Sequence, residues 1–178
     1  SEFGNYDVSI SLPSNYVVAA TGQLQTPSEH TFLEDKIRAS SYLKYDDIVF
    51  DKDTFPRSSA NYKTIRYTAQ NVHDFAWFAD KRYWVKKNKI TLPSGRKIDS
   101  YIMFTKLEAD VWKDALKYNK RAIQYYSNIV GEYPYPTVSV VQGDYKGCDM
   151  EYPMVTVIGR AGYKAGLDNV ITHEIGHN

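Results

Sequence analysis

The segment 173–177 reads His-Glu-Ile-Gly-His and constrains the fold more than any other part of the chain. Two histidines four residues apart lie slightly more than one turn apart on an α-helix, so His173 and His177 would project from one face and hold one metal ion together. The same helix carries apolar residues at helical spacing: Leu167, Val170, Ile171 and Ile175. The pattern predicts a helix that begins near Leu167 or Asp168, with Asp168 at the positive end of the helix dipole.

Glu174 lies about 100° around the helix axis from His173, where its carboxylate can take a proton from a metal-bound water. A shuffled chain of the same composition would contain this pattern with a probability of about 0.3%, so chance does not account for it. A catalytic zinc has three protein ligands, whereas the motif supplies two. Either an unrecognised acidic residue completes the site or the third ligand lies beyond Asn178, and we expect the second. We expect His30 and His73, which are distant in sequence, to have surface or structural roles.

A second pattern lies about 20 residues before the histidine motif, where segment 147–153 reads Gly-Cys-Asp-Met-Glu-Tyr-Pro and an apolar run follows over 154–158. The apolar run predicts a strand. A carboxylate at the entry to that strand could reach a metal cleft and pair with a cationic group of a substrate. Taken alone, an acidic residue in this position indicates only a solvated side chain, so Glu151 is a candidate because of the motif that follows it.

Elsewhere, apolar and polar residues alternate at a period of two, which is typical of strands. The alternation predicts strands over residues 6–12, 16–20, 63–69 and 137–141, and a turn at 92–95 that joins strands 82–91 and 96–105 into a hairpin. Residues 111–130 change to three- and four-residue spacings, which predict one long amphipathic helix. Residues 26–63 indicate loops around brief elements near 32–45. The order of these elements predicts an α+β fold.

The composition excludes several classes of protein. Lys and Arg number 22 against 21 Asp and Glu, which argues against a nucleic-acid binder or a membrane binder that works by bulk charge. No run approaches the roughly 20 apolar residues that cross a bilayer. Hydrophobic residues make up 43% of the 178 residues, enough to form a core. The chain enters a strand pattern at Tyr6 without a basic or apolar leader, as an excised piece of a longer protein would.

Together these residues resemble the M1 family of zinc aminopeptidases, the gluzincins with a thermolysin-like catalytic domain. The resemblance rests on Met150 and Glu151, which match the G-x-M-E-N exopeptidase motif, on the H-E-x-x-H motif and on the interval between them. Segment 71–77 is also similar to the opening of the catalytic domain in bacterial members. The resemblance implies that residues 1–70 are the C-terminal part of an N-terminal β domain. Residues 71–178 would be the β-rich first lobe of the catalytic domain, ending on the H-E-x-x-H helix.

The resemblance also implies a role for each residue of the two motifs. His173 and His177 correspond to zinc ligands and Glu174 to the general base, while Glu151 corresponds to the residue that binds the free α-amino group of a peptide substrate. The family's third zinc ligand is a Glu on the next helix, and a later Tyr stabilises the reaction intermediate. Neither position exists in this chain. We therefore expect the 178-residue chain to be inactive, to hold Zn²⁺ weakly or not at all, and to self-associate through exposed apolar surface.

The substrate side departs from the family pattern at two positions. Cys148 stands where the family commonly has Gly, and Tyr152 where it commonly has Asn, so the amine pocket is expected to differ in shape. Met150, Asp149 and Cys148 would still line the substrate site, the last two through backbone groups. Cys148 has no evident activating histidine, so we expect a packing residue rather than a nucleophile.

Two other functions stay open. The first is a thermolysin-like zinc endopeptidase, which would cut blocked peptides as well as free ones. The second is a non-catalytic M1-like binding or scaffold module that keeps the fold. A Glu151→Ala variant that selectively loses cleavage of free N-termini would favour the aminopeptidase, and the presence of His173, Glu174 and His177 argues against the scaffold.

Overall fold

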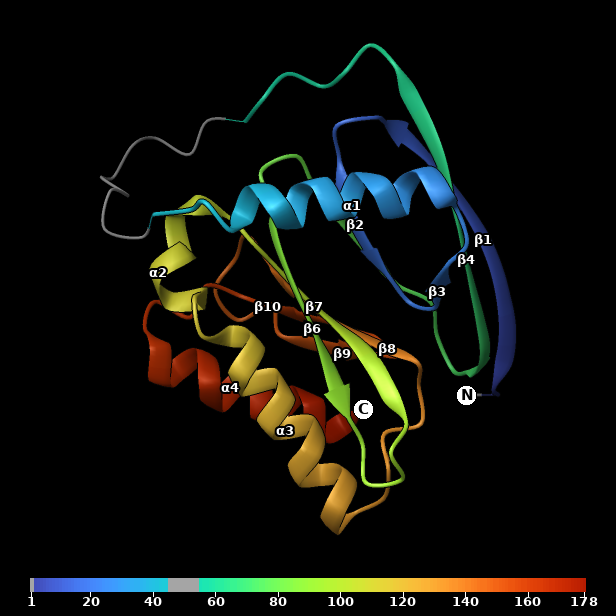
Figure 1. Ribbon diagram of the computed structural model, residues 1–178, viewed down its shortest axis with the longest axis vertical. Coiled ribbons are helices and arrows are strands. Elements are labelled where there is room, and N and C mark those ends of the chain that lie inside the picture. The colour runs from blue at the N-terminus through green and yellow to red at the C-terminus, as the bar shows by residue number, and fades with distance from the viewer. Residues whose placement is uncertain (1, 45–54) are drawn as a thin grey trace.

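The computed structural model describes residues 2–44 and 55–178 and shows an α+β fold with three sheets (Figure 1). The helices within these residues are α1 (Pro27–Ser40), α2 (Ala109–Trp112), α3 (Ala115–Ile129) and α4 (Lys164–His177), with a 3₁₀ turn at Lys106–Glu108. The strands are β1 (Gly4–Pro13), β2 (Val17–Ala20), β3 (Gln23–Leu24), β4 (Tyr62–Val72), β5 (Trp77–Asp80), β6 (Trp84–Thr91), β7 (Lys97–Phe104), β8 (Thr137–Gln142), β9 (Met150–Tyr152) and β10 (Val155–Ile158). The predicted α+β class is confirmed.

The first sheet, in the order β1-β4-β3, is antiparallel and follows from the alternating residues near the start of the chain. Ile10 of β1 lies opposite Ile65 of β4, and both are buried. Their neighbours Ser9 and Arg66 also lie opposite each other, and both are exposed. This period of two turns one face of the sheet toward a core, which β2 joins through Val18.

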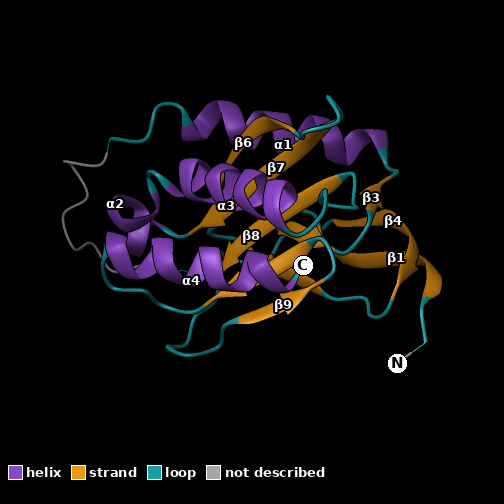
Figure 2. Ribbon diagram, turned by 90° about the horizontal axis from the view of Figure 1, so that it is seen from below, coloured by secondary structure: helices purple, strands orange, loops and turns teal. Residues whose placement is uncertain are grey.

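The five-stranded sheet, in the order β6-β7-β8-β10-β9, supports the main core. β6 and β7 form the predicted hairpin, β8 runs parallel to both β7 and β10, and β9 is an antiparallel edge strand that the sequence did not indicate. Helices α3 and α4 lie on one face of this sheet, and α1 lies on the opposite face (Figures 1 and 2). Val140 of β8 therefore packs in the core beneath α3 and α4, while its neighbour Val141 packs in the core that includes Leu33 of α1. Among the residues described, no helix is long and apolar enough to cross a membrane.

Helix α1 is longer than the brief elements expected near residues 32–45, of which residue 45 lies outside the described part of the chain. Pro27 favours the start of this helix because its missing N–H needs no partner there. Leu33 is buried against the five-stranded sheet, whereas most of the helix is polar. Tertiary packing, rather than an amphipathic pattern, stabilises α1, which is why periodicity did not predict it.

Residues 111–130 contain the end of α2 and the whole of α3 rather than one continuous helix. Trp112, the last residue of α2, is fully buried, stacks on Phe104 and donates its indole N–H to the carboxylate of Glu108 at 3.2 Å. The carbonyl of Asp114 then accepts the first backbone hydrogen bonds of α3. The interruption between α2 and α3 lets the indole of Trp112 point into the core. This burial depends on contacts with residues distant in sequence, so helical spacing alone does not predict it.

Helix α4 begins at Lys164, earlier than expected, so Asp168 lies in its second turn. The prediction that Asp168 interacts with the helix dipole is therefore wrong, because that effect is confined to the first turn. Instead, the Asp168 carboxylate forms an ion pair with Arg121 of α3. This ion pair links α3 and α4, the two helices that cover the main core.

Buried tyrosines are expected to make the fold sensitive to alkaline pH. Burial raises the pKa of Tyr67, Tyr83 and Tyr133 above the ordinary value of 10.0. The pKa of each of these tyrosines is higher in the folded chain than in the unfolded chain. The stability that a buried neutral tyrosine contributes is therefore complete below pH 10 and is lost as the pH rises further. Each buried tyrosine should then reduce the free energy of unfolding by about 1.4 kcal/mol per pH unit.

Urea unfolding at pH 8, 10 and 11 measures this loss of stability. In Tyr83→Phe, which also loses a 2.6 Å hydrogen bond to the carbonyl of Gln142, the decline above pH 10 should be shallower. Tyr42→Phe is the matched control because Tyr42 is 79% exposed, and its decline should equal that of the wild type. A free energy of unfolding that stays constant from pH 8 to pH 11 would contradict the prediction.

Candidate metal centre

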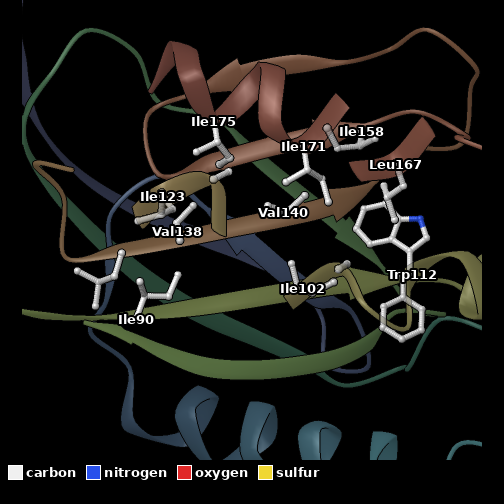
Figure 3. Packing of buried hydrophobic residues seen from close by; sticks show 14 of the residues in the cluster. Ile90, Ile102, Trp112, Ile123, Val138, Val140, Ile158, Leu167, Ile171 and Ile175 are labelled. Carbon is white, nitrogen blue, oxygen red and sulfur yellow. The ribbon is translucent and has the colours of Figure 1, made fainter. Parts of the chain in front are cut away.

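The two histidines of α4 converge on one point at the end of the helix. The helix buries Leu167, Ile171 and Ile175 against the five-stranded sheet, and Figure 3 shows these side chains pointing into the core beside Val140. His173 and His177 remain exposed, and their Nε2 atoms lie 3.2 Å apart. The predicted core side of this helix is thus confirmed, and the two histidines lie outside it.

The spacing of the two imidazoles fits zinc. Two nitrogens that bind one tetrahedral zinc at about 2.0–2.1 Å lie about 3.3 Å from each other, close to the observed separation. Within residues 2–44 and 55–178, no three His, Cys, Asp or Glu side chains are grouped so that they could hold a metal ion. His173 and His177 could therefore supply two of the three protein ligands that a catalytic zinc requires.

Glu174 lies on the inner side of the histidine pair, where its side chain contacts Glu151. Glu174 is 7% exposed, and its carboxyl group hydrogen-bonds the carboxyl group of Glu151. Burial raises the pKa of Glu174, and the hydrogen bond and charge of Glu151 raise it further. A backbone hydrogen bond lowers the pKa of Glu151, and the hydrogen bond from Glu174 and the two nearby imidazoles add to this effect.

These opposite shifts give the two carboxyl groups different chemistry. Glu151 retains the negative charge, which suits pairing with an ammonium group. Glu174 is the more basic of the two, which makes it the better proton acceptor. Two titratable groups with pKa values moved apart are typical of a site for acid–base chemistry.

Glu151 lies inside the short strand β9 rather than in a loop at the entry to β10. It pairs with Thr156 in an antiparallel hairpin, and the hairpin turns at Met154, whose φ of 66° is rare for a residue with a side chain. The backbone of Met154 is held on both sides: its N–H donates to the side chain of Asn178, and its carbonyl accepts from the N–H of Ser139. The strained turn thus places Glu151 beside α4.

The remaining candidate residues of the 147–153 segment lie in and beside the loop that leads to β9. Asp149 accepts a hydrogen bond from the backbone N–H of Gly159 at 2.7 Å, which ties the loop to the end of β10. Cys148 donates its thiol to the carbonyl of Tyr145 and packs close to Gly143, where a Cβ would lie 2.6 Å from Sγ. Met150 is 46% exposed at the edge of the sheet.

The structure also brings a residue to the site that sequence analysis assigned elsewhere. His73 follows β4 and lines a small pocket together with Glu151 and His177. The only local signal was its place in segment 71–77, because its distance in sequence from the motif gave no indication of contact. His30 lies on α1 with Nε2 at 3.0 Å from the carbonyl of Leu24, in keeping with a surface or structural role.

Comparisons with known proteins show the fold that this site belongs to. No family model and no curated protein match the chain. Among solved structures, it is similar to a mutant two-domain M1 zinc metallopeptidase bound to L-arginine (14% identity, TM-score 0.65) and to the M1 zinc metallopeptidase from Deinococcus radiodurans (13%, 0.61). A mutant two-domain M1 zinc metallopeptidase bound to L-tryptophan also matches (13%, 0.62).

Each of these matches covers 98% of this chain and 34% of the other chain. The chain therefore spans about a third of the length of the solved structures that it matches. At this level of identity the likeness shows the fold alone: four helices and three sheets, within residues 2–44 and 55–178, that resemble a portion of M1 peptidase structures.

Proposed function

We propose that this chain belongs to a zinc-dependent aminopeptidase that removes N-terminal residues from peptides. The observation that carries the proposal is the pair of imidazole nitrogens 3.2 Å apart, with Glu174 buried beside them and in contact with Glu151. The likeness to M1 zinc metallopeptidase structures supports the proposal. Two of those structures are bound to the free amino acids L-arginine and L-tryptophan. A free amino acid carries the α-ammonium group that Glu151 would bind.

Each residue of the site has its own proposed role in peptide hydrolysis. His173 and His177 would hold the zinc, which when bound supplies a Lewis acid for the scissile carbonyl and lowers the pKa of water. Glu174 takes a proton from the attacking water and returns it to the leaving amine. Glu151 binds the α-ammonium group of the substrate and so positions the first peptide bond beside the histidine pair.

The proposed enzyme is a longer protein of which this chain is one part. The metallopeptidases that it resembles are about three times as long, and the described residues offer two zinc ligands. The third ligand and the group that stabilises the reaction intermediate would come from other residues of the full-length protein. The 178-residue chain alone is expected to be inactive and to bind zinc weakly.

Hydrolysis of a free aminoacyl anilide and of its N-acetylated twin tests the proposal. Both substrates are given, with zinc, to the 178-residue chain and to the full-length protein. We expect cleavage by the full-length protein only and of the free amine only, because Glu151 pairs with an ammonium group that acetylation removes.

Other outcomes of the anilide assay would overturn particular parts of the proposal. Equal cleavage of the acetylated substrate would indicate an endopeptidase and remove Glu151 from its role. Cleavage by the 178-residue chain would mean that the chain supplies its own third ligand. Cleavage of neither substrate by the zinc-loaded full-length protein would overturn the aminopeptidase.

A further inference from the structure

A small pocket lies next to the histidine pair, where the end of α4, strand β9 and the segment after β4 meet. Its volume is about 90 Å³, and its wall includes His177, Glu151, Tyr152, Tyr135 and His73. One water occupies about 30 Å³ of the liquid, so the pocket has room for about three waters. It suits a short side chain rather than a long stretch of peptide.

The position of His73 in this pocket is determined by the core. The residue before it, Val72, is fully buried and packs in one cluster with Met154. Met154 is the turn residue of the hairpin that carries Glu151. The same apolar contact thus fixes His73 on one side of the pocket and Glu151 on the other.

Two further contacts hold the segment that carries His73. Asn71 adopts a φ of 54°, which turns the chain as β4 ends, and its N–H donates to the side chain of Asn5 at 3.0 Å. The ring of Phe3 packs edge-on against the imidazole of His73, with ring centroids 5.8 Å apart. The imidazole is exposed, and its contact with Phe3 together with the buried Val72 before it holds it at the edge of the pocket.

We infer that His73, with Tyr135, forms the wall against which the side chain of the substrate's N-terminal residue packs, so that His73 limits the size of that side chain. The inference rests on the proposed aminopeptidase function. With the α-ammonium group at Glu151 and the scissile carbonyl at the histidine pair, the pocket beside His73 borders both groups and offers space for the first side chain. The preferred substrates are peptides that begin with a short residue such as alanine or serine.

Removing the imidazole should broaden the specificity of the enzyme. The measured quantity is the ratio of kcat/KM for leucine anilide to kcat/KM for alanine anilide, in the full-length protein with zinc. We expect this ratio to rise at least 10-fold in His73→Ala. Even one methylene in an apolar pocket changes discrimination between substrates by about 10–200-fold. A general loss of folding would lower both rates and leave their ratio unchanged. His30→Ala is the matched control, because His30 is exposed on α1, interacts with the carbonyl of Leu24 and does not line this pocket.

Ligand binding provides a second readout that does not require turnover. Calorimetry gives the dissociation constants of L-alaninamide and L-leucinamide for full-length Glu174→Gln, with and without His73→Ala. The ratio of the constant for L-alaninamide to that for L-leucinamide should rise when His73 is replaced. A wild-type enzyme that is active while either ratio is unaffected by His73→Ala would overturn the inference and leave the aminopeptidase standing. A full-length wild type that cleaves neither anilide would overturn both.

Discussion

Glu174→Gln is expected to reduce the peptidase activity of the full-length protein by about 100- to 10,000-fold, the range associated with a lost general base. An amide cannot take the proton of the attacking water. It can still donate a hydrogen bond to Glu151, so the contact between the two side chains survives. Zinc content, measured by mass spectrometry of the dialysed protein, should match the wild type because Glu174 is not among the proposed ligands.

A matched control separates the catalytic role of Glu174 from a general effect of charge. Glu34 is an exposed residue of α1, which lies on the face of the five-stranded sheet opposite α4 (Figure 2), so Glu34→Gln should keep wild-type activity. Loss of zinc together with activity in Glu174→Gln would show a ligand rather than a base. Full activity in this variant would exclude the proposed mechanism.

The second large effect is expected at a buried ion pair in the N-terminal half of the chain. Glu29 of α1 and Lys63 of β4 lie 2.8 Å apart, with side chains that are 2% and 15% exposed. Lys63 also donates to the carbonyl of Tyr16 and lies 3.7 Å from the centre of the Phe32 ring. Burial raises the pKa of Glu29 and lowers that of Lys63, because the charged forms have lost water.

Removing one partner should leave a buried charge without compensation. Glu29→Leu and Lys63→Met are each expected to reduce the free energy of unfolding by about 3–5 kcal/mol, measured by urea unfolding at pH 7. The double variant should recover most of the loss, since two apolar side chains of similar size replace the pair.

An exposed ion pair in the same sheet provides the control. Asp7 and Arg66 form two hydrogen bonds of 2.7 Å but have side chains that are 60% and 51% exposed, so Asp7→Asn should leave the unfolding midpoint unchanged. Single variants of the buried pair that are as stable as Asp7→Asn, or a double variant less stable than both singles, would contradict the interpretation.

The candidate site divides into a local part and a part made by packing. His173, Glu174 and His177 lie within five consecutive residues, so the helical period alone predicts that the two imidazoles share a face. His73 lies 104 residues from His177, and no local pattern relates the two. Their meeting depends on Val72 and Met154, which pack together only when the first sheet and the β9-β10 hairpin are both formed.

The same distinction explains the fold. Strands with alternating residues, such as β1 and β4, and the β6-β7 hairpin could be predicted because period and turn chemistry are properties of short segments. Helix α1 and strand β9 could not, since each is stabilised mainly by the partner that it packs against or pairs with. The division between α2 and α3 likewise depends on where Trp112 is buried.

The sequence by itself determined the α+β class, the face of α4 that carries His173 and His177, and the two motifs at 147–153 and 173–177. Only the tertiary structure decided that Glu151 contacts Glu174, that Asp168 pairs with Arg121 and that His73 borders the pocket. The physical reason is the range of the interactions. Backbone geometry sets the spacing of side chains within one helix or strand, whereas burial in a shared core determines which distant side chains meet.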